Sequence, residues 1–347
     1  YRHLDLNDTY VERSALVRGL VTLLGSKDLA ELAIASSGEN GDYYYSPGDE
    51  TYHPASAYIM ESYLAERFVS MAVSSSPQLS IFEDDIGKAI CDFEKSEGVE
   101  LTEEQRNSIM GCCTHNISMI VGGAGTGKTT VLKAVYYVLE RLYGAQIEQA
   151  ALAGKAAQRM FESTGKPAFT IARLLNMYSG NGFDEGLTLG IDEASMLDLP
   201  TAYRIMRKLP DTGRLILIGD NYQLPAIGAG LVFHSLIDEK VIPKTILSVV
   251  KRQSDASGIP QVAKAIREHR IPKFAEYRGR GSGVSFIDCS EDEITENCLK
   301  IYMELGGTGE DFSTAIVSPT KKGNGGVNEI NIAFQSHYRS SDMAVLY

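Results

Sequence analysis

Apolar and polar residues follow two different patterns along the chain, and the pattern changes near residue 100. Residues 10–35 and 55–75 carry apolar side chains at helical spacing, which predicts helices. Residues 38–54 are rich in Gly, Asp, Pro and Tyr, which predicts an exposed loop or a small hairpin. A charged helix is expected over residues 83–98. The first hundred residues are therefore predicted to be mainly helical.

Short apolar strands alternate with helical segments from residue 101 onward. Thr102 and Gln105 have the spacing of a capping box, which predicts that a helix begins there. We expect a helix over 128–143 and strands at 117–123, 146–152, 187–193 and 214–220. Strands separated by helices favour a parallel sheet with helices on both faces, so the predicted fold class is α/β.

Composition narrows the class of protein. Of 347 residues, 44% are hydrophobic and 22% are charged, which excludes collagen-like, mucin-like and wholly disordered chains. The sequence contains no apolar run of about 18 residues and no secretory signal pattern, so we expect a cytoplasmic protein without a membrane segment. The five cysteines form no CxxC pair, which predicts reduced structural thiols.

The negative charge is concentrated in the first part of the chain. Residues 1–100 carry a net charge of −11 out of −12 for the whole chain, whereas residues 241–280 carry +6. Phosphate contacts dominate nucleic-acid affinity, so an acidic N-terminal part is expected to serve as a protein interface or scaffold. The basic stretches after residue 100 are candidates for nucleic-acid contact, with solvated helix faces as the alternative.

A glycine-rich segment after the strand at 117–123 carries the first candidate chemistry. GGAGTGKT, residues 122–129, fits GxxxxGK[ST] and is followed by a predicted helix. Its glycines permit the positive φ angles that turn backbone N–H groups toward one anion. Lys128 is expected to bridge the β- and γ-phosphates of ATP, and Thr129 to offer its hydroxyl to Mg²⁺. The predicted nucleotide-binding residues here are Gly122, Gly123, Ala124, Gly125, Thr126, Gly127, Lys128, Thr129 and Thr130.

Two later strands end in further polar candidates. Asp192 and Glu193 end the strand at 187–193; Asp192 is expected to hold Mg²⁺ and Glu193 to orient or deprotonate the attacking water. The strand at 214–220 is followed by Gln223, whose amide both donates and accepts hydrogen bonds and is the candidate sensor of the γ-phosphate.

Taken together, these motifs resemble the RecD-like group of superfamily 1 helicases, which includes the exodeoxyribonuclease V alpha subunit. The DEAS, GDNYQLPAIGAG and KRQ segments in this order are more specific than the phosphate loop alone. The matching segments span roughly residues 101–335 and are LTEEQRNSI, GGAGTGKTT, LAGKAAQRM, IDEASMLDL, IGDNYQLPAIGAG, VVKRQSDASGI and VSPTKKGNGGVNEINIAFQ.

The resemblance implies a RecA-like P-loop NTPase that uses ATP and Mg²⁺ to move 5′→3′ along single-stranded DNA and to unwind duplex, in recombination or repair. It implies that Gln105 reads the adenine edge, that Arg252 reaches the γ-phosphate across the cleft, and that Gln223 couples nucleotide state to DNA grip. The DNA contacts that it implies are Lys155, Arg159, Thr170, Pro319 and Thr320. Ala172 stands where relatives commonly have a histidine.

The domain organisation is also inferred from this resemblance. We expect an acidic helical accessory domain at 1–98, a RecA-like ATPase domain at 99–280, and the start of a second RecA-like domain at 281–347. Residues 174–188 are expected to form a short pin-like insert where relatives have a longer hairpin pin, so either the pin is vestigial or residues are missing. A strand and a helix are expected over 281–303. No late helicase motif follows Gln335, so we expect the chain to be a fragment or to be joined across unobserved segments.

Two other functions stay open. The motifs also suit the helicase module of a conjugative relaxase, although the six histidines form no cluster of the kind that a relaxase nuclease domain would need. A subunit that binds DNA and uses nucleotide only as a switch is the non-enzymatic alternative, which the intact Lys128, Asp192 and Glu193 disfavour. The expected partners are single-stranded DNA and, through residues 1–98, nuclease or helicase subunits.

Overall fold

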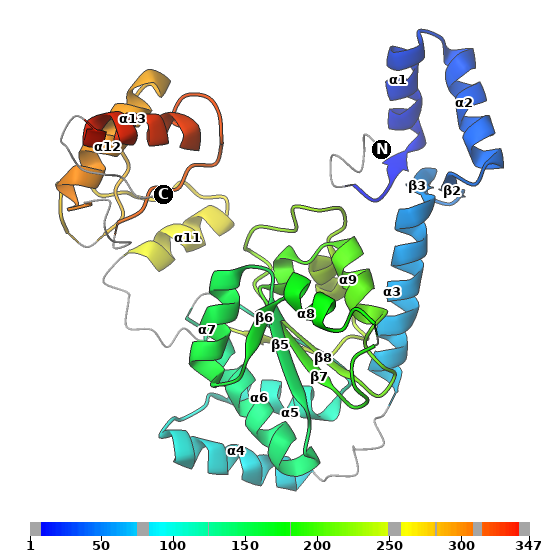
Figure 1. The fold of residues 1–347 in the computed structure, drawn as a ribbon, viewed down its shortest axis with the longest axis vertical. Helices are drawn as coiled ribbons and strands as arrows, with labels where there is room; N and C mark the ends of the chain where they lie inside the picture. The colour runs from blue at the N-terminus through cyan, green and yellow to red at the C-terminus, as the bar shows by residue number, and fades with distance from the viewer. Residues whose placement is uncertain are drawn as a thin grey trace. The chain divides into compact units, whose positions relative to one another are not determined.

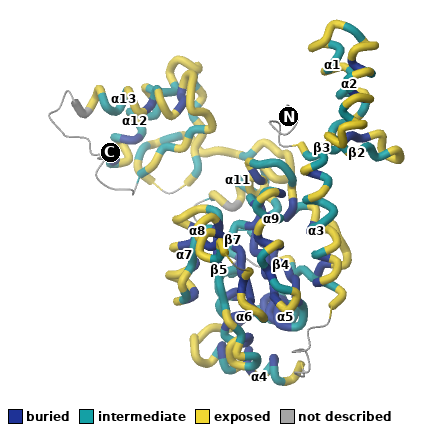
Figure 2. Tube along the Cα trace, turned by 45° about the vertical axis from the view of Figure 1, so that its right-hand side comes forward, coloured by how far each residue is buried: buried dark blue, intermediate teal, exposed yellow. Residues whose placement is uncertain are grey.

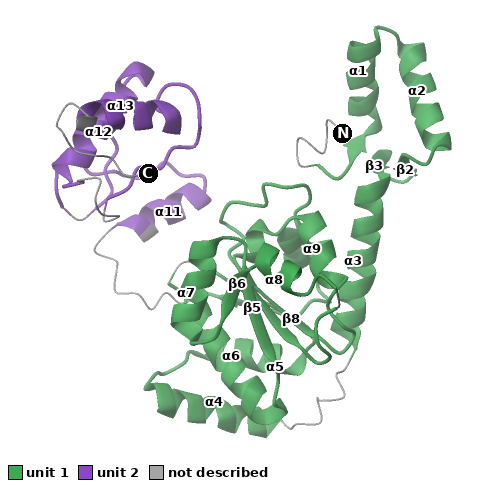
Figure 3. Cartoon of the chain, in the orientation of Figure 1, with its two compact units in different colours: residues 1–251 green, residues 252–347 purple. Residues whose placement is uncertain are grey.

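The structure is a computed structural model of the 347-residue chain. It describes residues 8–74, 83–123, 125–180, 182–248, 258–281, 283–307 and 314–339. The chain divides into two compact units, residues 1–251 and 252–347 (Figure 3). The elements of each unit are described separately below.

A six-stranded parallel sheet forms the centre of the first unit (Figure 1). Its order is β6-β5-β7-β8-β4-β9, so β8 lies between β4 and β7. All four predicted strands are confirmed. The strands are β4 (Ile117–Gly122), β5 (Ile147–Ala151), β6 (Ala168–Thr170), β7 (Thr188–Asp192), β8 (Arg214–Gly219) and β9 (Lys244–Leu247).

Helices cover both faces of this sheet, as the pattern predicts. Alternate residues of one strand enter two separate hydrophobic cores: Met119 packs in one core and Ile120 in the other. Figure 2 shows the buried strands between helices that are exposed on their outer sides. The helices packed on the sheet include α5 (Glu103–Thr114), α6 (Lys128–Tyr143), α7 (Gly154–Thr164), α8 (Ile171–Met177), α9 (Leu199–Met206) and α10 (Val232–Asp238).

The helix expected over 128–143 is confirmed at both ends. Gly127 precedes it with φ 85° and Gly144 follows it with φ 61°, and both conformations favour glycine. The capping box of Thr102 and Gln105 is formed at the start of α5, with both reciprocal hydrogen bonds present. Local signals therefore define where these two helices begin.

The first residues form helices and a small antiparallel sheet. Strands β2 (Tyr43–Ser46) and β3 (Thr51–Pro54) form the hairpin predicted within 38–54, and β1 (Val11–Glu12) pairs with β3. The predicted helices are α1 (Arg13–Leu24), α2 (Lys27–Glu39), α3 (Ala55–Val73) and α4 (Glu83–Glu97). The mainly helical prediction is therefore confirmed.

Helices α3 and α4 contribute to the hydrophobic cores on the two faces of the parallel sheet. Phe68 of α3 packs in the core on one face, and Phe93 of α4 packs in the core on the other. Arg67 also donates to Asp211 at 2.5 Å, which joins α3 to the loop after α9. These contacts join residues 1–98 to the first unit, and the two compact units divide at 251/252, whereas the expected boundaries follow residues 98 and 280.

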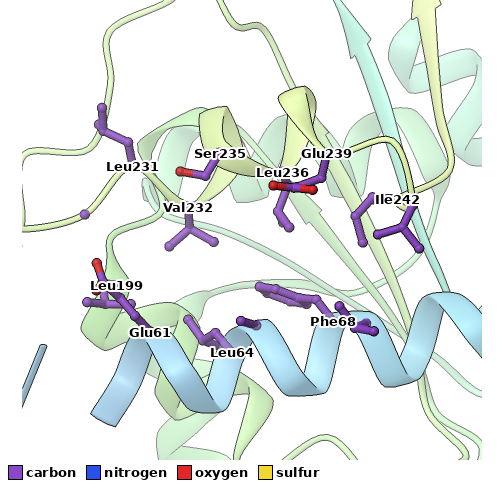
Figure 4. Close-up of a pocket in the computed structure, with 14 residues that line it drawn as sticks. Glu61, Leu64, Phe68, Leu199, Leu231, Val232, Ser235, Leu236, Glu239 and Ile242 are labelled. Carbon is purple, nitrogen blue, oxygen red and sulfur yellow. The ribbon is translucent and has the colours of Figure 1, made fainter. Parts of the chain in front are cut away.

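An apolar groove of about 410 Å³ runs between α3 and α10 (Figure 4). Leu64, Phe68 and Leu236 are among its buried lining residues. Glu61 and Glu239 are its charged lining residues. Its described lining comes from these two helices, their flanking loops and Leu199 of α9, whereas the predicted phosphate loop follows β4.

Within 174–188, the described residues comprise the end of α8, a packed loop and the first residue of β7, and they contain no strand pair before β7. Phe183 is buried, packs edge-on against Tyr178, and donates its backbone N–H to Lys208 O at 2.8 Å. The backbone N–H of Gly186 donates to Thr212 Oγ1 at 3.0 Å. These bonds hold the segment against the body of the unit, so it does not project as a hairpin pin.

The second unit contains three helices in its described residues: α11 (Ile259–Arg267), α12 (Ile294–Glu304) and α13 (Val327–Arg339). The helix expected within 281–303 is confirmed as α12. The strand expected just before it is wrong, because that segment forms only an isolated parallel bridge between Ala275 and Ser285. That these residues begin a second RecA-like domain stays a prediction.

The prediction of free cysteines is confirmed, since all five cysteines are unpaired. Burial raises the pKa of the Cys112 thiol to about 11, which suits a structural thiol. Among the described residues, the search for a helix of membrane-spanning length and apolarity finds none.

Candidate nucleotide-binding site

The phosphate loop connects the carboxyl end of β4 to the first turn of α6. Gly125 and Gly127 have φ angles of 83° and 85°, so the loop has the left-handed residues that its sequence predicts. Thr126 Oγ1 donates to Gly123 O at 2.9 Å and closes the loop on itself. Ala124 lies outside the described residues. The loop thus ends at a helix N-terminus, where backbone N–H groups and the helix dipole favour an anion.

Lys128 is held over this loop by backbone oxygens. Its Nζ donates to Gly122 O at 2.5 Å and to Gly123 O at 3.0 Å. Burial lowers the pKa of Lys128, and the carboxylates of Asp220, Asp192 and Glu193 counteract that shift. The ammonium group therefore lies within electrostatic reach of three acids from the ends of β7 and β8.

Asp192 ends β7 on the same side of the sheet as α6. Its Oδ1 accepts a hydrogen bond of 2.8 Å from Glu193 N. Burial raises the pKa of Asp192, while this hydrogen bond and the charge of Lys128 lower it in part. The carboxylate is thus poorly solvated and benefits from any further cation or donor.

Glu193 has an unusual backbone for a residue other than glycine. Its φ of 54° and ψ of 35° lie in the left-handed region, directly after a buried strand. Such conformations cost roughly 1–3 kcal/mol and are concentrated at functional sites. Because this turn ends the strand, Glu193 does not follow the alternation by which successive side chains of a strand point to opposite faces of the sheet.

Asp220 is a further acid at this edge that the sequence did not single out as a site residue. It is 5% exposed and accepts a hydrogen bond from Tyr222 N at 3.0 Å through Oδ1. Its position at the end of an apolar strand was the available signal. Gln223, the predicted phosphate sensor, follows it on an exposed loop, and its backbone N–H donates to Asp220 O at 3.1 Å.

Gln105 is buried and connects α5 to the phosphate loop. Its Oε1 accepts from Thr102 N at 3.0 Å, and its Nε2 donates to Thr126 O at 3.1 Å. A Cβ on Gly127 would collide with this amide, which explains why glycine is needed there. The structure places Gln105 beside the loop, and its reading of adenine stays a prediction.

The available ligands fit Mg²⁺ by their chemistry. Thr129 follows Lys128 at the start of α6, and Asp192 lies within electrostatic reach of Lys128. Hydroxyl and carboxylate oxygens are the ligands that Mg²⁺ prefers, and Mg²⁺ usually keeps several waters, so two protein oxygens are sufficient. Thr130 continues the same helical turn.

The residues predicted to contact DNA lie in three places. Lys155 and Arg159 are exposed and one turn apart on α7, so they share one side of that helix. Thr170 caps α8, where its hydroxyl accepts from Arg173 N at 3.3 Å. The other predicted contacts, Pro319 and Thr320, are exposed in the second unit, and Arg252 lies outside the described residues.

Comparison with known proteins defines the class. The AAA domain family matches residues 100–287 of this chain. The match spans more than half of the sequence and includes the phosphate loop and the ends of β7 and β8. The chain therefore belongs to the AAA domain family.

Within that class the chain is similar to proteins named RecD2 DNA helicase and RecD subunit. It is 30% identical over 252 residues to the ATP-dependent RecD2 DNA helicase of Deinococcus radiodurans, covering 71% of this chain and 34% of that protein. It is 30% identical over 171 residues to the RecBCD enzyme subunit RecD of Haemophilus influenzae, covering 40% and 27%. The chain spans about a third or less of these relatives.

A relative of another kind also matches. The probable conjugal transfer protein TraA of Sinorhizobium fredii is 29% identical over 157 residues, which cover 44% of this chain and 14% of that protein. The chain is therefore similar to proteins with two different kinds of name.

Proposed function

We propose that this chain carries the ATP-hydrolysing part of a RecD-like DNA helicase that moves 5′→3′ on single-stranded DNA and acts in recombination or repair. The class is that of the AAA domain, and the homologues carry RecD and RecD2 helicase names. The direction of movement and the DNA substrate follow from the resemblance alone and are part of the proposal.

One observation carries the proposal: the ammonium of Lys128, on the phosphate loop, lies within electrostatic reach of Asp192 and Glu193. A cation, a metal-holding acid and a candidate water base thus converge at one edge of the sheet. Phosphoryl transfer depends mainly on positioning and electrostatic stabilisation, which this arrangement supplies. Lys128 and the loop N–H groups would hold the phosphates while Glu193 orients the attacking water.

Thr129 and Asp192 are the residues that would hold Mg²⁺. When bound, the ion neutralises charge that develops on the phosphate oxygens. Gln105 would position the phosphate loop and the adenine base, and Gln223 would respond to the γ-phosphate. Arg252, which lies outside the described residues, is proposed from the resemblance to reach the γ-phosphate.

Single-stranded DNA is the proposed polymer partner. The exposed cations Lys155 and Arg159 on α7 support contact with phosphates, and Thr170, Pro319 and Thr320 are proposed along the same strand. The acidic residues 1–98 are proposed to bind other subunits, such as a nuclease or a second helicase, in the cytoplasm.

The proposal is tested by ATP hydrolysis with and without single-stranded DNA. We expect DNA to stimulate turnover. We expect Glu193→Gln to retain ATP binding while turnover falls by about 10²–10⁴-fold, the usual contribution of a positioned base. A nucleotide switch without motor activity would be favoured by two results together: ATP turnover of the wild type is not stimulated by DNA, and Glu193→Gln binds and turns over ATP like the wild type.

A second candidate function is the helicase part of a conjugative transfer protein, which the match to TraA favours. DNA-stimulated ATPase activity is common to both candidates. A cleavage assay on a supercoiled plasmid that carries a transfer origin, run with the complete natural protein, distinguishes the two candidates. A conjugative transfer protein is expected to cut the plasmid, and a RecD-like helicase is expected to leave it uncut.

A further inference from the structure

Tyr136 lies near the middle of α6, two turns after Lys128. Its side chain is completely buried. Its hydroxyl has no hydrogen-bond partner among the described residues. A buried hydroxyl without a partner costs roughly 1–3 kcal/mol, and phenylalanine would fill the same space without that cost. The Tyr136 hydroxyl therefore lowers stability unless it forms a hydrogen bond in a functional state of the protein.

The hydroxyl is directed at the strand that ends in Asp192. Helical side chains lean toward the N-terminus of their helix, so Tyr136 reaches back toward the Lys128 end of α6. It rests against the backbone of Gly190, where a Cβ would collide with its oxygen. Gly190 and Asp192 are two residues apart in β7 and face the same side of the sheet. The glycine thus creates the space through which the hydroxyl approaches Asp192.

The two groups complement one another. Asp192 is poorly solvated and accepts a hydrogen bond from Glu193 N through Oδ1, which leaves Oδ2 for a further donor or a metal. Burial raises the pKa of Tyr136 well above its ordinary value, and the negative charge of Asp192 raises it further. The phenol therefore stays protonated and remains a donor beside an acid that lacks solvation.

We propose that Tyr136 is a positioning residue for Asp192: its hydroxyl donates a hydrogen bond toward the Asp192 carboxylate when that carboxylate turns to hold Mg²⁺. This inference rests on the proposed function, which assigns Asp192 to the metal. Outer partners that orient a metal ligand typically change metal affinity or activity by about 10–100-fold when they are removed. Tyr136 itself touches neither the metal nor ATP.

The test compares Tyr136→Phe with Tyr137→Phe in the full chain. Tyr137 is the next residue of α6; its ring packs near Phe93 and its hydroxyl accepts from Arg141 Nη1 at 3.0 Å. Each substitution removes one phenol oxygen from the same helix. The measurement is the Mg²⁺ concentration needed for half-maximal binding of a fluorescent ATP analogue, together with the thermal midpoint of each variant.

We expect Tyr136→Phe to need about tenfold more Mg²⁺, at the lower end of the range for outer partners of a metal ligand, while binding without Mg²⁺ stays unchanged. We expect Tyr137→Phe to match the wild type.

A Tyr136→Phe protein with the wild-type Mg²⁺ requirement overturns the inference, whatever its thermal midpoint. A shift in the midpoint alone is what a purely structural role would produce. If the wild type binds the analogue equally well with and without Mg²⁺, the metal assignment in the proposed function fails and this inference fails with it. The wild-type curve therefore distinguishes failure of the function from failure of the inference.

Discussion

Each end of the parallel sheet holds a cation, half-buried Lys128 at one end and buried Arg214 at the other, and the two ends surround it differently. Lys128, at the carboxyl end, donates to two backbone oxygens of the phosphate loop and has three acids within electrostatic reach. Arg214, at the amino end of β8, is 4% exposed and donates to His115 O at 3.1 Å and Cys113 O at 3.3 Å. Burial lowers the pKa of both groups.

The surroundings explain the difference in role. Arg214 lies 5.5 Å from the centre of the Tyr143 ring, and its electrostatic neighbours are that phenol and the thiols of Cys113 and Cys112. Its carbonyl partners and aromatic neighbour make a satisfied structural contact. Lys128 has acids nearby that are themselves poorly solvated, which is the condition expected where a phosphate and a metal are to be bound. Burial of a cation therefore does not by itself reveal its role, whereas the groups around it distinguish a structural cation from one in a binding site.

The largest expected effect comes from removing the first cation. Lys128→Ala should reduce ATP turnover by about 100-fold or more, because it removes charge that stabilises the transferred phosphoryl group. Its unfolding midpoint should change little. Steady-state ATPase assays check the first result and thermal melting the second. A variant that unfolds easily but hydrolyses ATP normally would make Lys128 the structural cation instead.

Arg214→Leu should have the opposite profile. It removes the Arg214 donor from His115 O and leaves Cys113 O with only the Tyr143 hydroxyl at 3.5 Å, which should lower the free energy of unfolding by about 2 kcal/mol. Affinity for ATP should be unchanged in the folded protein. Urea unfolding and equilibrium nucleotide binding measure these two quantities. A large loss of ATP affinity with unchanged stability would contradict the comparison.

Gly127→Ala should combine both kinds of effect on a smaller scale. Alanine is strained at φ 85°, and its Cβ would meet the Gln105 amide. We expect a loss of about 1 kcal/mol in stability and weaker nucleotide binding. Gly144→Ala is the matched control, since it has φ 61° after the far end of α6 and open space around it. That control should lose stability and retain binding.

The smallest effect concerns pH. Burial raises the pKa of Asp192 and lowers that of Lys128, so the pH range in which both are ionised is narrower than for exposed residues. Mg²⁺-dependent nucleotide binding should weaken as pH falls through the raised pKa of Asp192, and weaken again at alkaline pH as Lys128 loses its proton.

The loss of nucleotide binding at acid pH should not result from unfolding caused by protonation of Asp192. A raised carboxyl pKa in the folded state makes its contribution to stability more favourable as pH falls. Binding curves measured from acid to alkaline pH, with a melting curve at each point, check the prediction. Loss of binding only where an exposed aspartate titrates would contradict it.

Much of this fold could be predicted where the signal was local. The capping box of Thr102 and Gln105 and the glycines around α6 define helix ends with nearby residues alone. The short strand β6 was not predicted, because three half-buried residues carry little pattern. The strand expected before α12 was wrong, since strand formation needs a pairing partner that sequence spacing does not reveal.

The residues of the candidate site that follow predicted strands could also be predicted from the sequence. Lys128, Asp192 and Glu193 follow apolar strands, and parallel strands bring their carboxyl ends together. Tyr136 could not be distinguished from an ordinary core position of α6. Gly190, inside an apolar strand, was the available signal of a close approach. Its partner lies more than fifty residues earlier, so only the fold shows what approaches it.

Both outer strands of the parallel sheet are short. At one border, β6 has three residues, and at the other, β9 has four. An outer strand presents unpaired backbone groups that can recruit a strand from another molecule, and a short one offers few sites for such pairing. The sheet can thus keep the fully buried strands β4 and β8 in its interior with little tendency to self-associate side by side at high concentration.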